Sequence, residues 1–179
     1  MLVGHSYGGV VSRLYASTYP ADVAGMVLVD SLSPELRANM TDQEWEIWNV
    51  LNERSPEQIA DYPDLERIDA GRALDQLVDA APIRQLPLVV ITADELNGPK
   101  IQEQALAGQL PPGVPADFGY LIDAAHQDAQ AQVALLVEGA QHVTAHSGHN
   151  VMIDNAPVVI DAIDAVVDAV RDDRSTAIS

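Results

Sequence analysis

MLVGHSYGG, residues 1–9, contains the pattern G-x-S-x-G, with Gly4, Ser6 and Gly8 in its fixed positions. An apolar run before the serine and a helical period after it predict a sharp strand-to-helix turn with the serine at its apex. Side chains two positions before and after the serine would collide with the neighbouring strand and helix, so both positions need glycine. We expect the Ser6 hydroxyl to face a substrate and the amide N–H of Tyr7, at the helix start, to stabilise an oxyanion.

The composition limits the classes of partner. The chain has 179 residues, 47% of them hydrophobic, which suits one globular domain with a sizeable core. Its 27 acidic and 9 basic residues give a formal net charge of −18, which argues against nucleic acid or an anionic membrane surface as a partner. No stretch is long enough to span a bilayer. Cysteine is absent and no secretion signal is visible, so we expect a cytoplasmic protein without disulfides or thiolate metal sites.

Three further apolar runs predict strands, at residues 23–31, 86–94 and 140–145. The first two lack polar alternation, which is typical of parallel strands covered by helices on both faces. Helical periods follow Ser6 and fill residues 117–137, and another begins at Asp154 or Asn155. The pattern predicts an α/β fold with a mostly parallel sheet and flanking helices, whose strands all end at one edge.

The segment 32–85 has a different pattern of short helices interrupted by prolines. Thr41 and Glu44 have the spacing of a capping box, which predicts a helix start. Trp45 and Trp48 share one stripe of that helix. We interpret 32–85 as a helical lid or cap over the carboxyl edge of the sheet, whose tryptophans either contact a substrate or pack the lid onto the body.

A reactive serine needs a nearby base and a carboxylate that orients this base. Among the five histidines, His149 is the best placed, because it lies on a glycine-bearing loop after the last predicted strand. His5 sits at a strand end from which it cannot easily reach the serine, and His126 is expected on the surface of a helix. A metal site formed by His142, His146 and His149 is disfavoured, because no carboxylate with suitable spacing accompanies them. We therefore expect neither a metal nor another cofactor.

Two aspartates are candidates for the orienting carboxylate. Asp30 ends the strand that follows the serine helix, and Asp94 ends the next strand along the chain. Both strand ends are open to a histidine loop, so topology alone does not decide between them. An aspartate in either place can also simply cap the following helix.

Several of these motifs together resemble the carboxyl-terminal part of an α/β-hydrolase, and the resemblance covers almost the whole chain. They are Gly4-His5-Ser6-Tyr7-Gly8-Gly9, Tyr19-Pro20, Val27-Leu28-Val29-Asp30, the strand with Pro87, and Ser147-Gly148-His149. In many members the acid follows the later strand as Gly-x-x-Asp, but the matching positions here read Ala93-Asp94-Glu95-Leu96. The leucine at the usual place of the acid favours Asp30, as in members whose acid follows the earlier strand.

The resemblance implies a serine hydrolase that cleaves ester-like bonds of a small molecule with Ser6, His149, Asp30 and the Tyr7 amide. A cofactor-free haloperoxidase, a carbon–carbon bond hydrolase with the same triad and a non-catalytic binding module are the alternatives. Members of the family carry several strands before the serine turn. We therefore expect residues 1–179 to form one partial α/β-hydrolase domain, a fragment with its first strand at the sheet edge, which is poorly active or aggregates. The oligomeric state stays open.

Overall fold

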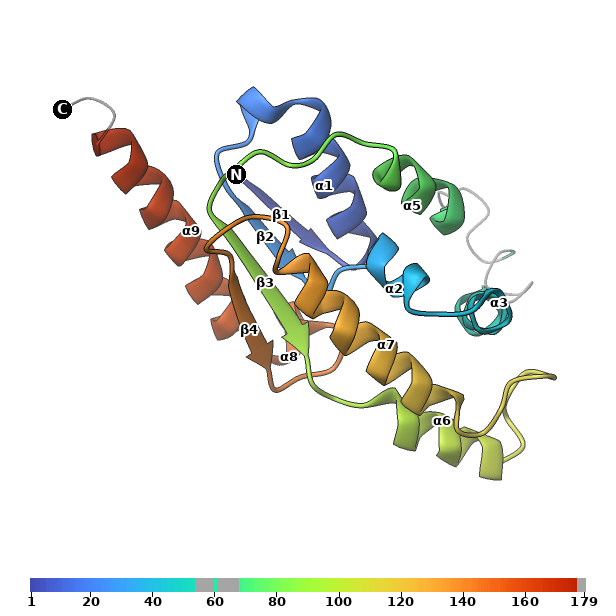
Figure 1. The fold of residues 1–179 in the computed structure, drawn as a ribbon. Helices are drawn as coiled ribbons and strands as arrows, with labels where there is room; N and C mark the ends of the chain where they lie inside the picture. The colour runs from blue at the N-terminus through green and yellow to red at the C-terminus, as the bar shows by residue number, and fades with distance from the viewer. Residues whose placement is uncertain (54–59, 61–67, 177–179) are drawn as a thin grey trace.

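The computed structural model describes residues 1–53, 60 and 68–176. Within these residues four parallel strands form one sheet in the order β1-β2-β3-β4, so that β1 and β4 are its edges. The strands are β1 (Leu2–His5), β2 (Met26–Val29), β3 (Leu88–Ala93) and β4 (Gln141–Ala145), and Figure 1 shows them pointing the same way. The predicted parallel α/β sheet is confirmed, with strands slightly shorter than the apolar runs.

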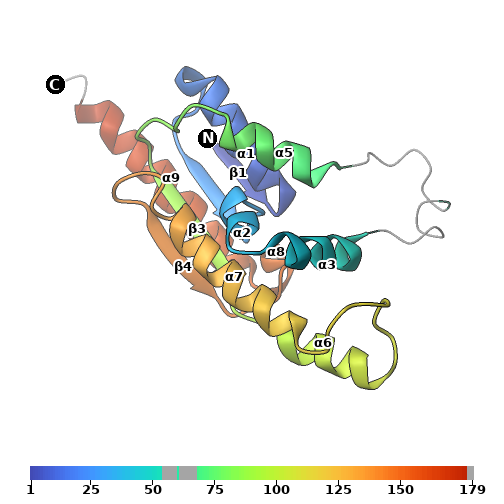
Figure 2. The same ribbon diagram turned by 45° about the vertical axis from the view of Figure 1, so that its right-hand side comes forward.

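Helices cover both faces of this sheet (Figures 1 and 2). The helix α9 (Ala156–Thr176) packs on one face against β2 and β3, and α1 (Tyr7–Thr18) and α7 (Phe118–Val133) pack on the other. The remaining helical elements in chain order are η1 (Pro20–Asp22), α2 (Pro34–Ala38), α3 (Asp42–Asn52), α5 (Ala70–Val78), α6 (Asn97–Leu106) and α8 (Val151–Asp154).

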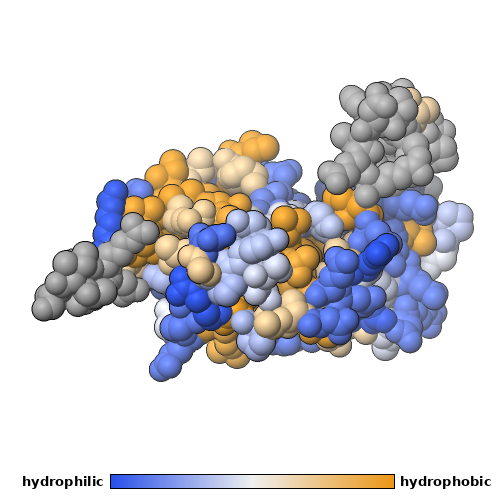
Figure 3. Space-filling view, turned by 90° about the horizontal axis from the view of Figure 1, so that it is seen from above, coloured by the Kyte–Doolittle hydropathy of each residue, from blue (hydrophilic) through white to orange (hydrophobic). Residues whose placement is uncertain are grey.

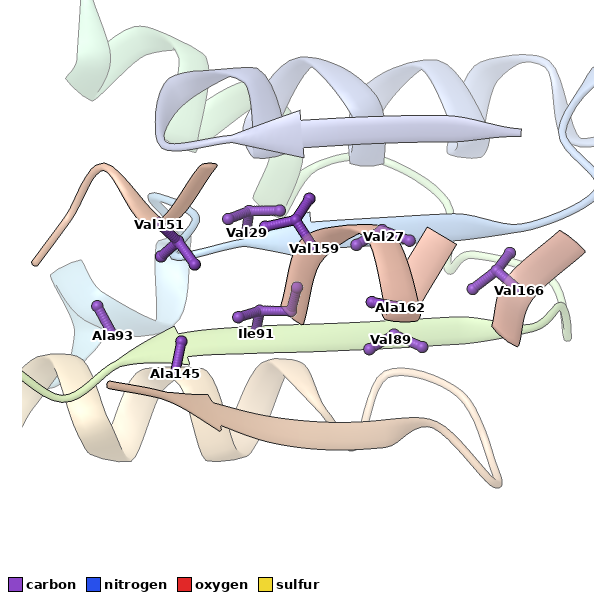
Figure 4. Packing of buried hydrophobic residues seen from close by; sticks show 10 residues of the cluster. All are labelled: Val27, Val29, Val89, Ile91, Ala93, Ala145, Val151, Val159, Ala162 and Val166. Atoms are coloured by element: carbon purple, nitrogen blue, oxygen red, sulfur yellow. The ribbon is translucent and has the colours of Figure 1, made fainter. Parts of the chain in front are cut away.

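The two central strands show why their sequences lack polar alternation. Val27 and Val29 of β2 point into a cluster with α9, whereas Met26 and Leu28 pack against α1 and the end of α7. The residues of β3 alternate in the same way. Figure 4 shows the side facing α9, where valine, isoleucine and alanine side chains of the strands meet Val159 and its neighbours on the helix. Both faces of each strand are therefore buried, as the continuous apolar runs predicted.

A second hydrophobic cluster holds the helices of one face together. It joins α1, α2, α3, α5 and α7 through buried residues that include Val10, Trp45, Leu74 and Ala129. The predicted capping box at the start of α3 is present: Thr41 Oγ1 accepts from the Glu44 amide, and the Glu44 carboxylate accepts from the Thr41 amide. Part of the segment 32–85 that we interpret as a lid lies outside the described residues, namely 54–59 and 61–67.

The helix α6 begins at Asn97 without a capping side chain in the preceding loop. The carboxylate of Asp123 on α7 accepts hydrogen bonds from the amides of Asn97 and Gly98, both 2.8 Å away, and so supplies the acceptors that the first turn lacks. This cap comes from another helix and has no local sequence signal. In the part of the chain that the structure describes, no helix is both long and apolar enough to cross a membrane.

Candidate active site

Ser6 lies between the last residue of β1 and the first residue of α1, with a left-handed backbone (φ 52°, ψ −124°). This conformation is rare for a residue with a side chain and costs on the order of 1–3 kcal/mol. Backbone hydrogen bonds hold it in place: the Ser6 amide donates to Val29 O at 3.1 Å, and Ser6 O accepts from the amides of Gly9 and Leu32 at 3.0 Å. The turn after β1 is thus strained and fastened to the end of β2.

The glycines of the turn differ in the space around them. A Cβ atom on Gly4 would lie 2.5 Å from Gly8 O, and one on Gly9 would overlap the Cβ of Ser31. Apart from its chain neighbours and the backbone of α1, a Cβ atom on Gly8 would meet no atom of the described residues within 4 Å. Our expectation of a collision was therefore right for Gly4 and wrong for Gly8, because it is Gly9, one residue further along α1, that faces the loop after β2.

Asp30 follows the last residue of β2 and also has a left-handed backbone (φ 42°). Its carboxylate accepts three hydrogen bonds: from His149 Nδ1 to Oδ2 at 2.6 Å, and from His126 Nε2 at 2.8 Å and the Ala93 amide at 3.0 Å to Oδ1. Burial on its own raises the pKa of Asp30, but the hydrogen bonds from both histidines and from Ala93 outweigh it and hold the pKa well below its usual value. Asp30 is therefore ionised at neutral pH.

His149 lies on the loop between β4 and α8, with about half of its side chain exposed. Because the ionised Asp30 can only accept, the His149 proton sits on Nδ1 and the lone pair of the neutral ring is on Nε2. His5 Nε2 donates to the backbone carbonyl of His149 at 2.8 Å, and the two rings lie 4.6 Å apart. His5 thus fastens the loop that carries His149 to the end of β1.

Ser6, Tyr7, Asp30, His126 and His149 all line one open cavity of about 1390 Å³ at the carboxyl edge of the sheet. Among the described residues the Ser6 side chain makes no hydrogen bond, so it shares the cavity with His149 without a direct bond to it. The amide N–H of Tyr7 belongs to the first turn of α1, where amides have no acceptor within the helix.

The walls of the cavity are apolar and acidic. Trp48 lines it and stacks on the buried Trp45, with ring centroids 4.5 Å apart. Lys100 is the only lysine or arginine among the described lining residues, which include the acidic Glu53, Asp69, Glu95 and Asp154. The electrostatics of the cavity therefore disfavour a substrate with several negative charges.

Asp94 is directed elsewhere. Its carboxylate accepts from His146 Nδ1 and from the Ser147 amide, and it does not line the cavity. His142 Nε2 lies 2.7 Å from Thr92 Oγ1, and burial lowers the pKa of His142. The histidines on β4 and directly after it thus have separate partners, and within residues 1–53, 60 and 68–176 no three potential ligands are grouped as a metal ion would require.

Sequence reasoning misjudged His126. We expected it on the surface of a helix, but its side chain is 19% exposed and bonds to Asp30. It belongs to a polar stripe of α7 with helical spacing, together with Asp123, Gln127 and Gln130. Gln127 donates to Ala93 O at 3.1 Å and Gln130 to Ser31 O at 2.8 Å. Such a stripe on a helix next to buried strand ends is the signal that would have located His126.

Comparisons with known proteins agree with the fold. A sequence model of a family described as the alpha/beta hydrolase fold matches residues 1–119. No curated protein matches the sequence significantly.

Three solved structures are similar to this chain over most of its length. An alpha/beta superfamily hydrolase from Oenococcus oeni is 16% identical, with a TM-score of 0.43 over 96% of this chain and 67% of its own. A probable hydrolytic enzyme from Pseudomonas aeruginosa is also 16% identical, with a TM-score of 0.45 over 90% of this chain and 61% of its own. A monoacylglycerol lipase from Paleococcus ferrophilus is 13% identical, with a TM-score of 0.42 over 94% of this chain and 67% of its own.

The chain thus spans between 61% and 67% of the length of these structures. The family match covers residues 1–119 of 179, well over half of the sequence, and the chain therefore belongs to the family of the alpha/beta hydrolase fold.

Proposed function

We propose that this chain carries the catalytic triad of a serine hydrolase that cleaves ester-like bonds of a small molecule through an acyl-enzyme. Ser6 is the nucleophile, His149 the general base and Asp30 the acid that orients His149. The observation that carries the proposal is the 2.6 Å hydrogen bond from His149 Nδ1 to Asp30 Oδ2, on the wall of the cavity that Ser6 also lines. A strained serine, an oriented imidazole and a buried carboxylate around one cavity are the parts that acyl transfer needs.

The reaction follows from the proton positions. Ser6 Oγ attacks the carbonyl carbon of the substrate while its proton moves to Nε2 of His149, and the carbonyl electron pair moves to the oxygen. The Tyr7 amide donates a hydrogen bond to that oxyanion. When the carbonyl re-forms, the alcohol leaves with the proton from His149. Water then attacks the acyl-enzyme in the same way and restores Ser6.

Labelling and turnover test the nucleophile. A fluorophosphonate probe reacts only with an activated serine, so we expect it to label the wild type and not Ser6→Ala. Hydrolysis of p-nitrophenyl acetate is expected to be lost in the same variant. Equal labelling or equal hydrolysis in Ser6→Ala would contradict the proposal, and a wild type that the probe leaves unlabelled would favour a non-catalytic binding module.

A matched pair of variants tests the acid. Asp30→Asn keeps the shape of the side chain but removes the charge that selects the His149 tautomer, so kcat should fall by about 10³- to 10⁴-fold. Asp94→Asn is the control, because Asp94 also follows a strand and also accepts from a histidine, yet lies outside the cavity. We expect its kcat to stay within about twofold of the wild type. The reverse order of effects would assign the acid to Asp94.

A further inference from the structure

Two imidazole rings share the carboxylate of Asp30, one on each oxygen. His149 donates to Oδ2 and His126 to Oδ1, at 2.6 and 2.8 Å. They come from different parts of the chain: His149 from the loop after β4, and His126 from the middle of α7. The triad proposed above uses one of these rings and leaves the second without a role.

The protons on both rings follow from the charge of Asp30. The side chain of Asp30 is 6% exposed and the hydrogen bonds keep it ionised, so both oxygens can only accept. His126 must therefore carry its proton on Nε2, as His149 carries its proton on Nδ1. In this arrangement Nδ1 is the nitrogen of His126 that Asp30 leaves free, whereas His149 keeps Nε2 free. Of the two rings, His149 is the one whose free nitrogen lies at the tip of the ring.

The backbone around His126 is held firmly against the strand ends. Gln127 and Gln130, one and four residues further along α7, donate to backbone carbonyls of Ala93 and Ser31. On the same helix Ala125 and Ala129 are buried in the cluster that joins α7 to α1, α2, α3 and α5. His126 is thus a rigid donor and not a mobile surface side chain.

We propose that His126 is a positioning residue that fixes the plane of the Asp30 carboxylate. The Ala93 amide alone is a single donor to Oδ1, and one hydrogen bond tolerates a range of χ2 angles of the carboxylate. With His126 on the same oxygen, both donors to Oδ1 fix its direction and leave Oδ2 aimed at His149 Nδ1. This inference rests on the proposed function for its catalytic consequence, but the shared carboxylate can be tested without turnover.

Three variants separate positioning from simple packing. His126→Leu removes the donor and puts an apolar side chain of similar size in its place. His126→Gln replaces it with an amide whose nitrogen reaches about as far as Nε2 and still donates. Because a carboxylate that is out of position orients His149 less well, kcat in His126→Leu should fall by about 10- to 100-fold while KM changes little. His126→Gln should recover most of kcat. His146→Leu, in the exposed pair with Asp94, is the control and should match the wild type.

Proton NMR of histidine-labelled protein provides the readout that does not need activity. In the wild type we expect two protected low-field N–H signals, both lost in Asp30→Asn. His126→Gln should lose one and keep the other, from His149, at its original shift. His126→Leu should move or broaden the His149 signal, although the variant remains folded by circular dichroism.

The outcomes distinguish the two proposals. If His126→Leu keeps both the wild-type kcat and the His149 signal, the positioning role is wrong. If kcat falls equally in His126→Leu and His126→Gln, or KM rises with kcat unchanged, His126 acts through packing or substrate binding and the proposal is also overturned. If the wild type hydrolyses no ester, the proposed function fails, while the His149 signal still supports or rejects the shared carboxylate.

Discussion

At the scale of single residues, Ser6 and Asp30 stand out because they are the two non-glycine residues with positive φ in the described part of the chain. Each directly follows one of two neighbouring strands, β1 and β2. Glycine would relieve about 1–3 kcal/mol of strain at either position, but it would remove the hydroxyl or the carboxylate. Strain at two adjacent strand ends is therefore consistent with selection for side-chain chemistry at this edge.

The adjacent pair Gly8 and Gly9 allows a test at this scale. Gly8 lies in α1 where an added Cβ would meet no atom of the described residues within 4 Å apart from its chain neighbours and the helix backbone, and alanine favours a helix over glycine by about 1 kcal/mol. Gly8→Ala should therefore leave the free energy of unfolding unchanged or raise it by up to about 1 kcal/mol. Gly9→Ala forces its Cβ into Ser31, which is fully buried, and should lower it by roughly 1–3 kcal/mol. Urea titration measures both, and equal losses would show that Gly8 is as crowded as Gly9.

Only part of the candidate site could be predicted from the sequence. The serine turn has a fixed local pattern, so Ser6 and Tyr7 could be placed from the sequence. The choice between Asp30 and Asp94 could not be made from topology, because both follow parallel strands and the choice depends on where His149 and His146 point. His126 was misjudged, because its hydrogen bond to Asp30 joins residues 96 positions apart in the sequence. His5 was left without a role, because its partner His149 is 144 positions away.

At the scale of elements, the strands were predictable because burial on both faces leaves a continuous apolar run. The sequence could not predict which helices pack on which face. The buried apolar side chains of α9 and of α1 and α7 are mostly valine and alanine, so the apolar composition does not distinguish the two faces. The start of α6 has no local sequence signal for a related reason, because its cap, Asp123, lies on α7 and not in the preceding loop.

An ion pair links α1 to α2 and gives the acid sensitivity of this part of the fold. Both guanidinium NH groups of Arg13 donate to Glu35, at 2.9 and 3.0 Å, and the Arg13 side chain is buried. Burial on its own raises the pKa of Glu35, but the hydrogen bonds and charge of Arg13 lower it below the usual 4.5. A depressed folded-state pKa stabilises the protein above pH 4.5, and this contribution is lost as the pH falls through the lower value.

Glu35→Gln should therefore lower the free energy of unfolding at pH 7 by about 2 kcal/mol and make it fall less steeply as the pH drops below 4.5. Asp30, whose pKa is also lowered, keeps some acid sensitivity in the variant. Asp42→Asn is the matched control, because Asp42 pairs with Arg37 but is 91% exposed, so its loss should change stability by less than about 1 kcal/mol. Urea titrations across this pH range measure both variants. A pH profile of Glu35→Gln parallel to that of the wild type would exclude Glu35 as a source of acid sensitivity.

At the scale of the whole molecule, β1 is a sheet edge, with Val3 46% exposed. Unpaired edges favour association with other strands, so the expectation of self-association from the sequence stays a prediction. The same molecule carries a net charge of −18, which opposes close approach of two copies. Figure 3 shows one face of the molecule, on which hydrophilic and hydrophobic residues lie side by side.

The net charge also predicts how salt affects stability. With 27 acidic and 9 basic residues, most carboxylates have no basic partner available, and the exposed Asp161 and Asp164 follow one another along α9. Their mutual repulsion favours the expanded, unfolded chain. At 0.01 M salt the screening length is about 30 Å, comparable to a small domain, and at 0.15 M it is about 8 Å. Raising the salt should therefore remove more repulsion than attraction.

We expect the Tm to rise by about 2–4 °C when NaCl increases from 10 to 150 mM, which corresponds to roughly 1 kcal/mol for a chain of this size. Screening depends on ionic strength, so potassium chloride at the same ionic strength should give the same rise, whereas sucrose at the same osmolality should give a smaller one. Differential scanning calorimetry at constant pH measures the shift. A Tm that stays constant or falls would mean that ion pairs such as Arg13–Glu35 outweigh the repulsion among the unpaired carboxylates.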